Sequence, residues 1–341
     1  MKERDYRLDL LRVIAILGVL TVHSTNLDEP IASAPFLVHV LYGSLVRGSV
    51  PLFFACSGAL LLSPQRELST KRVWQHHIVK ILVPMYVWAM LYKIVNLVRG
   101  DILNVGTLVQ SVKEVLFFKH VLHFYYLHII LLVYAMVPIT RILTKNATKK
   151  QLQYCLFIWF LLGILYPTVY HIWPFSILEG IPTQWRLTLS YAAIGYGLLG
   201  DYLYRYPLSK RTGIFSILIG YLFTFSTTVG MSIYRGEACD WFYEGASFGP
   251  FLLTVGIFTL CLHAKFDPAA AKTKWISWLS KASFCVFLIH LFILFDLRAA
   301  LYSSGIPIFL AIPLNVVLLF AICAAAYTVL SKIPVVNRWL V

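Results

Sequence analysis

The chain has 341 residues, of which 59% are hydrophobic and only 13% are charged, and its mean hydropathy is +0.76. This composition excludes an ordinary soluble protein, because apolar stretches of about 20 residues, long enough to cross a bilayer core of about 30 Å, recur throughout. The formal net charge of +14 does not indicate a nucleic-acid partner, since the cations lie in short segments between apolar stretches.

These stretches predict an all-α polytopic membrane protein, a bundle of about ten transmembrane helices in a single domain over residues 1–341. The first span has no small-residue cleavage site and is expected to stay as an uncleaved anchor. The predicted spans are 8–27, 46–63, 73–98, 121–142, 152–171, 185–204, 213–234, 247–265, 282–302 and 308–331.

Alternate connections between these spans are basic, and the others carry most of the acids. The basic ones hold Lys2, Arg4, Arg7; Arg66, Lys71, Arg72; Arg141, Lys145, Lys149, Lys150; Arg205, Lys210, Arg211; Lys265, Lys272, Lys274, Lys281; and Lys332, Arg338. The acids are Asp28, Glu29, Glu179, Glu237, Asp240 and Glu244. The positive-inside rule therefore predicts both termini in the cytoplasm. The outer connection 166–184, rich in Pro and aromatic residues, is expected to cover an outward-facing cavity.

The first span carries an arginine and a histidine on one face. Ten residues separate Arg12 from His23, so the two side chains point the same way about 16 Å apart along a helix. Ionisable residues inside a span are costly and mark functional sites by default. Asp9, three residues before Arg12, is placed to hold its guanidinium. The alternatives are an interfacial histidine and an ion pair that only anchors the helix end.

Two further segments offer polar groups. Span two opens with Arg47, and its Ser57-Gly58 pair either lets another backbone approach closely or donates a hydrogen bond to substrate. In span three, Lys80 is either a snorkelling lysine or part of a pocket for a phosphorylated substrate.

Histidines recur in later spans. His120, His123 and His128 open span four, but no nearby acid or cysteine completes a metal set, so no metal is predicted. His290 lies in the middle of span nine and either bonds across helices or takes part in a site. The six cysteines have no paired spacing, so neither a disulfide framework nor a zinc site is expected.

These motifs resemble the acyltransferase-3 family of integral membrane acyltransferases. The resemblance rests on D-x-L-R with ten residues to His23, on R-x-x-V-P-L-F-F-x-x-S-G from Arg47 to Gly58, and on later blocks. Those blocks are an H-x-W-F-like motif at His123-Phe124-Tyr125-Tyr126, a glycine-tyrosine pattern at Gly195-Tyr196 and a run ending in His290. Tyr125 stands where the family has tryptophan, and Lys80 stands where it has arginine. The single-domain length is similar to that of bacterial enzymes that O-acetylate enterobacterial common antigen or other surface glycans.

The resemblance implies acyl transfer from acetyl-CoA to a hydroxyl of a cell-envelope polysaccharide or lipid-linked sugar, in the bacterial inner membrane. It implies donor binding by Arg12 and Lys80 from the cytoplasm. It also implies catalysis by His23, as a base or as an acyl carrier, with Asp9 supporting. Arg47, Ser57, His123 and His290 are the candidates for binding substrate or the developing oxyanion. The sequence does not predict an oligomeric state.

The alternative function is transport or flipping of a glycan or lipid-linked sugar, since buried Arg, His and Asp also occur in transporters. Release of free CoA thiol distinguishes the two functions.

Overall fold

The computed structural model describes residues 4–172, 174–178 and 180–341. Over these residues the chain forms helices and loops and no strand, which confirms the all-α prediction. Glu179, one of the acids used to predict the topology, lies outside the described residues.

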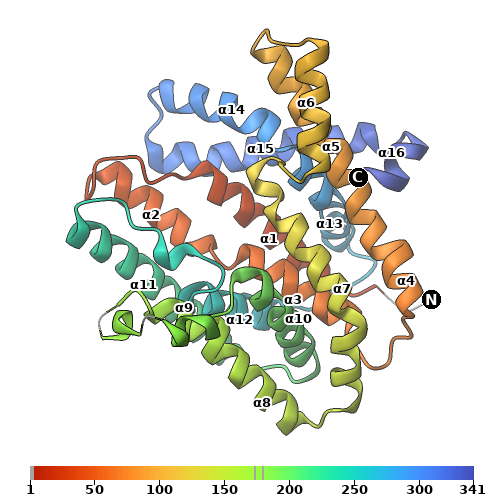
Figure 1. Cartoon of the computed structure of the whole chain (residues 1–341), viewed down its shortest axis with the longest axis vertical. Coiled ribbons are helices and arrows are strands. Elements are labelled where there is room, and N and C mark those ends of the chain that lie inside the picture. The colour runs from red at the N-terminus through yellow and green to blue at the C-terminus, as the bar shows by residue number, and fades with distance from the viewer. Residues whose placement is uncertain (1–3, 173, 179) are drawn as a thin grey trace.

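The helices follow one another with short connections (Figure 1). The α-helices are α1 Tyr6–Ser24, α2 Ala34–Val46, α3 Ser49–Leu61, α4 Thr70–Arg72, α5 Val79–Arg99, α6 Val105–Leu116, α7 Tyr125–Asn146, α8 Lys149–Phe160, α9 Tyr166–Val169, α10 Leu189–Arg205, α11 Lys210–Arg235, α12 Phe248–Leu262, α13 Ala271–Ile289, α14 Leu291–Ser303, α15 Ile308–Leu330 and α16 Pro334–Trp339. Two π-helical segments, Val73–Ile78 and Leu161–Leu165, join α4 to α5 and α8 to α9. The short 3₁₀ segments are Leu122–Phe124, Phe175–Ile177, Ile181–Trp185 and Trp241–Tyr243.

Of the predicted spans, 7 are confirmed as helices long and apolar enough to cross a membrane, or 8 if the bent pair α13 and α14 counts as one. Helices α1 and α10 also lie where spans were predicted. However, α1 carries three charged residues (Arg7, Asp9 and Arg12), and α10 has only 17 residues. The second predicted span begins too late, because the apolar helical stretch runs over Ala34–Leu61.

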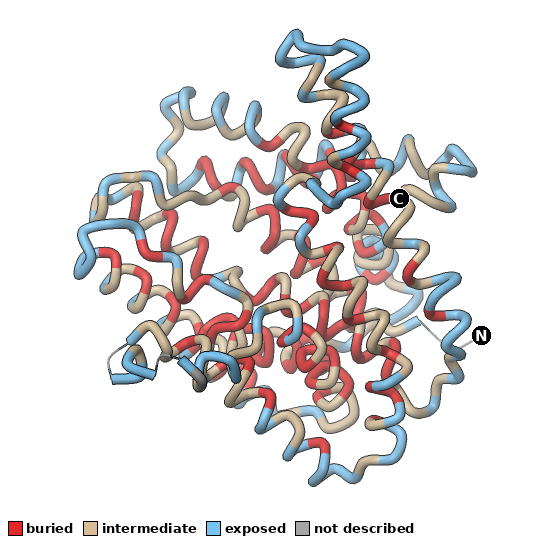
Figure 2. Tube along the Cα trace, viewed as in Figure 1, coloured by how far each residue is buried: buried red, intermediate tan, exposed pale blue. Residues whose placement is uncertain are grey.

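The surface of the bundle is apolar. In Figure 2 the buried residues lie along the central helices and the exposed ones at the perimeter. Large apolar side chains are exposed along the outer helix α11, namely Ile214, Phe215, Leu218, Ile219 and Leu222. A soluble protein does not expose such a stripe, whereas lipid solvates it. The chain is therefore a multi-pass membrane protein.

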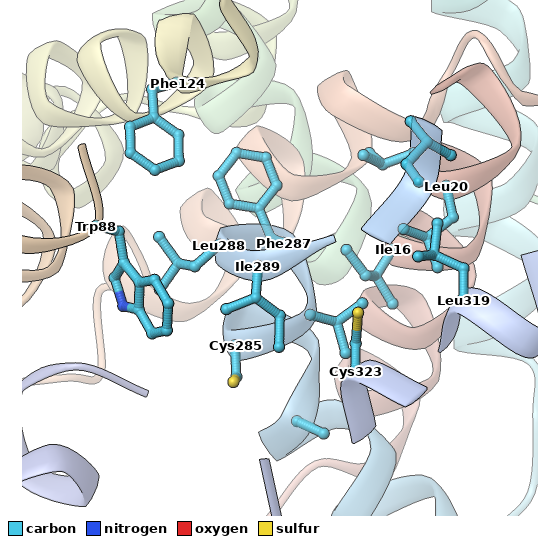
Figure 3. Close-up of a cluster of buried hydrophobic side chains, with 14 of the residues drawn as sticks. Ile16, Leu20, Trp88, Phe124, Cys285, Phe287, Leu288, Ile289, Leu319 and Cys323 are labelled. Atoms are coloured by element: carbon cyan, nitrogen blue, oxygen red, sulfur yellow. The ribbon is translucent and has the colours of Figure 1, made fainter. Parts of the chain in front are cut away.

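Helix α1 lies at the centre of the bundle and packs against α2, α3, α12, α13 and α15 (Figure 1). Its Ile16 and Leu20 join Cys285 and Leu288 of α13 and Leu319 of α15 in one buried cluster (Figure 3). A second cluster joins α1 to α3, α7, α10 and α12. Packing on all sides fixes the direction of the polar groups on α1.

Helices α3 and α10 approach so closely that only glycine fits between them. A Cβ on Gly58 would overlap the carbonyl oxygen of Gly197, and one on Gly200 would overlap that of Ala55. The predicted close backbone approach at Ser57-Gly58 is confirmed.

Both described ends of the chain lie at the same end of the bundle, the end of Arg12. Arg4 donates to the backbone carbonyl of Ser277 at the start of α13, and Leu340 accepts from the indole N–H of Trp88 on α5. At the opposite end, the amphipathic helix α6 projects beside the end of α5 (Figure 1).

Candidate functional site

Three histidines from distant parts of the sequence meet at the end of α1. The ring centroid of His290 lies 5.2 Å from that of His23 and 5.0 Å from that of His123, and His23 and His123 are 6.4 Å apart. His123 and His290 are buried, while His23 is partly accessible. The structure therefore brings together three of the residues singled out in the sequence.

The end of α1 is held by hydrogen bonds from α14 and α15. Arg298 donates to the backbone carbonyl of His23 (3.4 Å), and the hydroxyl of Tyr302 donates to that of Ser24 (2.7 Å). Asn315 donates to the Ser24 hydroxyl at 2.8 Å. These bonds fix the backbone from which the His23 side chain projects.

His290 stands at a break in the predicted ninth span. Residues 282–302 do not form one helix, because α13 and α14 meet at His290 with a bend of 82°. The Nδ1 atom of His290 lies 2.8 Å from the carbonyl oxygen of Phe287 and 3.2 Å from that of Val286. Carbonyl oxygens only accept, so Nδ1 carries the proton and Nε2 is left as an acceptor.

Several buried ring nitrogens in this cluster have no hydrogen-bond partner within the described chain: Nε2 of His290 and both nitrogens of His123. Leaving a buried polar atom unpaired costs about 1–3 kcal/mol, so these nitrogens are available to a bound molecule or to water. Among the described residues no group of three His, Cys, Asp or Glu side chains is arranged to hold a metal ion.

At the other end of α1, Asp9 holds Arg12 as predicted, with 3.9 Å between guanidinium and carboxylate. The sequence analysis missed its nearer partners, since Asp9 also accepts from Arg4 (2.5 Å) and from the Ser280 hydroxyl (2.9 Å). Asp9 lies about 21 Å along the helix from His23. It therefore touches Arg12 and not the histidine cluster.

Arg12 faces a cavity of ≈ 310 Å³ inside the bundle. Its side chain is 38% exposed, and this exposed surface opens into the cavity, together with Ser57, Tyr126, Lys281 and Phe287. Phe287 lines this cavity, and its ring lies 5.5 Å from that of His123, so one lining residue of the cavity borders the histidine cluster. Ser57 lies at the Arg12 end, and the structure does not bring it to His23.

Lys80 lies in a smaller neighbouring cavity of ≈ 210 Å³. This cavity shares Ile81, Tyr134 and Phe284 with the cavity of Arg12. The two cavities therefore share a wall, and Arg12 and Lys80 lie in adjoining spaces.

Arg47 lines neither of these two cavities but a third and larger one, of ≈ 720 Å³. Its guanidinium stacks 3.7 Å from the ring centroid of Tyr243, which also lines the cavity. The segment 166–184 contributes Pro167, Tyr170 and His171 to the lining, which agrees with its predicted position over a cavity. His171 stacks on Trp241 at 4.3 Å. Burial, and then the charges of Arg186 and Arg235, lower the pKa of His171, so this ring is neutral at pH 7.

The first turns of α7 form the wall between the large cavity and the cavity of Arg12. Tyr125 and Ile129 face the large cavity, whereas Tyr126 and Ile130 face the other one. His123 lies just before this wall. The histidine cluster is thus bordered by residues of both cavities.

On α14, Asp296 pairs with Arg99 at 3.0 Å. The sequence alone placed the aromatic segment 166–184 over the large cavity, but it did not point to Trp241 and Tyr243 in the lining or to Lys281 in the Arg12 cavity.

One of three comparisons with known proteins gave a match. The profile of the acyltransferase-3 family, described as an acyltransferase domain, matches residues 5–331. Neither the curated proteins nor the solved structures gave a match. Because the matched region spans nearly the whole chain, the protein belongs to the acyltransferase-3 family of membrane acyltransferases.

Proposed function

We propose that this acyltransferase moves an acetyl group from cytoplasmic acetyl-CoA to a hydroxyl of a cell-envelope polysaccharide or lipid-linked sugar, in the bacterial inner membrane. Family membership supports acyl transfer to a sugar or lipid. One observation supports the rest: Phe287, which lines the Arg12 cavity, lies 5.5 Å from His123, and Tyr125, which lines a larger aromatic cavity, follows His123 by two residues.

The Arg12 cavity suits the donor. Coenzyme A is a polyanion, and the cations Arg12, Lys80 and Lys281 line the two adjoining cavities at the Arg12 end of α1. Lys and Arg bind phosphate groups strongly. The acetylated arm then extends along α1 toward His23, about 16 Å away. Asp9 is a positioning residue that orients Arg12, and Ser57 contributes to the cavity wall.

The large cavity suits a sugar acceptor. Tyr125, Tyr170, Trp241 and Tyr243 line it, and aromatic faces pack against the apolar faces of sugar rings. Asp240 and Glu244 add acceptors for sugar hydroxyls. Arg47 provides a cation in this cavity.

In the proposed reaction, His23 takes the proton from the acceptor hydroxyl as its oxygen attacks the thioester carbonyl carbon. The C–S bond breaks, and the thiolate of CoA leaves and takes the proton back from His23. Arg47 and His123 stabilise the negative charge on the carbonyl oxygen. His290, whose Nδ1 is held by Phe287, presents Nε2 toward the cluster and orients His23.

The test uses purified protein in lipid nanodiscs with acetyl-CoA and an envelope glycan extract from a strain that lacks the protein. We expect release of CoA thiol that depends on the extract, and a mass gain of one acetyl group on a glycan. Movement of a glycan across a vesicle membrane without thiol release would instead support the transport function. Acetylated His23 in protein incubated without acceptor would overturn direct transfer in favour of an acyl-histidine intermediate.

A further inference from the structure

The small cavity at the Arg12 end is lined in part by a segment that the family profile does not cover. The profile ends at residue 331, whereas Arg338 and Trp339 of α16 line this cavity beside His77 and Lys80. Helix α16 therefore adds side chains to a cavity that adjoins the cavity of Arg12.

Helix α16 is fixed in place. The indole N–H of Trp88 donates to the carbonyl oxygen of Leu340 at 3.0 Å, and Val341 packs against the buried cluster shared by α1, α5 and α13. The helix also packs directly on α5, which carries Lys80. Arg338 and Trp339 are thus held at a set position relative to Lys80.

The cavity has the charge and shape of an anion site with an aromatic wall. Neither Lys80 nor Arg338 forms an ion pair with any residue in the described part of the chain. Two neighbouring cations without acidic partners favour a polyanionic ligand. The guanidinium of Arg338 lies over the ring of Trp339, 5.1 Å from its centroid, so a flat base would stack on the opposite face of the indole.

We propose that α16 completes the binding site for the nucleotide end of the donor. Arg338 and Lys80 bind phosphate groups of coenzyme A, and Trp339 stacks on its adenine. The inference rests on the proposed donor, and it adds that two of the residues that recognise the nucleotide, Arg338 and Trp339, lie outside the segment that defines the family.

The experiment measures equilibrium binding of CoA and 3′-dephospho-CoA to the full-length protein in nanodiscs, without acceptor. Variants are Arg338→Ala, Arg338→Lys, Trp339→Ala and Trp339→Phe. Exposed positions that do not line the cavity, Lys332→Ala and Trp275→Ala, serve as matched controls. We expect Arg338→Ala and Trp339→Ala each to raise the Kd for CoA about tenfold, with partial recovery in Arg338→Lys and Trp339→Phe.

The two ligands identify which phosphate Arg338 binds. If it is the 3′-phosphate, Arg338→Ala weakens CoA binding but leaves 3′-dephospho-CoA binding unchanged; if it is the diphosphate, both weaken equally. Equal CoA affinity in wild type and both alanine variants overturns the role of α16 while leaving the proposed function intact. No binding of CoA to wild-type protein overturns the donor itself, and the role of α16 with it. Elution as a single monodisperse species shows that a variant is folded.

Discussion

The imidazole of His290 lies 5.2 Å from that of His23, although the two residues come from the last third and the first helix of the chain. The chain bends by 82° where α13 ends at His290. At this bend the ring of His290 lies beside the end of α1. This pairing places an oriented acceptor beside the proposed base.

Replacement of that base gives the first prediction. His23→Ala should lower kcat by about 10²–10⁴-fold, the usual contribution of a general base. The KM for acetyl-CoA should change little, because the donor cations lie at the other end of α1. CoA thiol release in nanodiscs measures both constants, with the exposed His76→Ala as the control. A variant that keeps more than a tenth of the wild-type kcat would contradict the role of His23.

The role of His290 is tested by two amide variants. In His290→Asn, the side-chain N–H keeps the bond to the Phe287 carbonyl but leaves nothing at the position of Nε2. In His290→Gln, the amide reaches the Nε2 position. We expect kcat to fall about 10²-fold in the Asn variant, as for a misplaced catalytic group, with an unchanged KM and partial recovery in the Gln variant. Equal kcat in both variants would show that His290 serves only to cap α13.

Donor binding predicts a different kinetic signature at Arg12. Arg12→Ala should raise the KM for acetyl-CoA by about tenfold or more while kcat changes by less than a factor of a few. Asp9→Asn should follow in the same direction, because Asp9 holds Arg12 at 3.9 Å. Initial rates across a range of acetyl-CoA concentrations provide the measurement. If either variant loses kcat and keeps its KM, this end of α1 does not bind the donor.

Close packing of α3 on α10 predicts that Gly58→Ala destabilises the protein by about 1–3 kcal/mol, since the new methyl group would overlap the Gly197 backbone. Gly230→Ala in α11 is the matched control, because a Cβ there meets nothing within 4 Å. Alanine has the higher helix propensity, so the control should unfold no more easily than wild type. Thermal unfolding in detergent compares them. A Gly58→Ala variant as stable as Gly230→Ala would show that α10 is free to move away from α3.

Topology yields the last prediction. Single cysteines introduced at Lys332 and at Glu237 lie at opposite ends of the bundle, both exposed. In intact cells a membrane-impermeant maleimide should label the Glu237 position and spare the Lys332 position, because the positive-inside rule predicts that the basic connections lie in the cytoplasm. The reverse labelling pattern would show that the protein has the opposite orientation in the membrane, with the large cavity on the cytoplasmic side.

Local patterns in the sequence were sufficient to predict the all-α class and the helix face that carries Asp9, Arg12 and His23. Arg12 and His23 share a face because helical periodicity alone determines it, and Asp9 reaches Arg12 for the same reason. The glycine at position 58 indicated a close helix contact, since small residues let another backbone approach closely. In these cases the contact either joins residues of a single helix or depends only on the size of one side chain.

The tertiary structure decided the rest, because it depends on contacts between segments far apart in the chain. The break at His290 has no Pro or Gly to signal it, and it becomes apparent only where the ring bonds back to Phe287 and Val286. His23, His123 and His290 meet because the start of α7 and the junction of α13 and α14 both pack near the end of α1. The position of α16 beside Lys80 depends on a single hydrogen bond from Trp88 and on apolar packing. Periodicity determined which residues share a helix face, whereas side-chain packing between helices determined which faces meet.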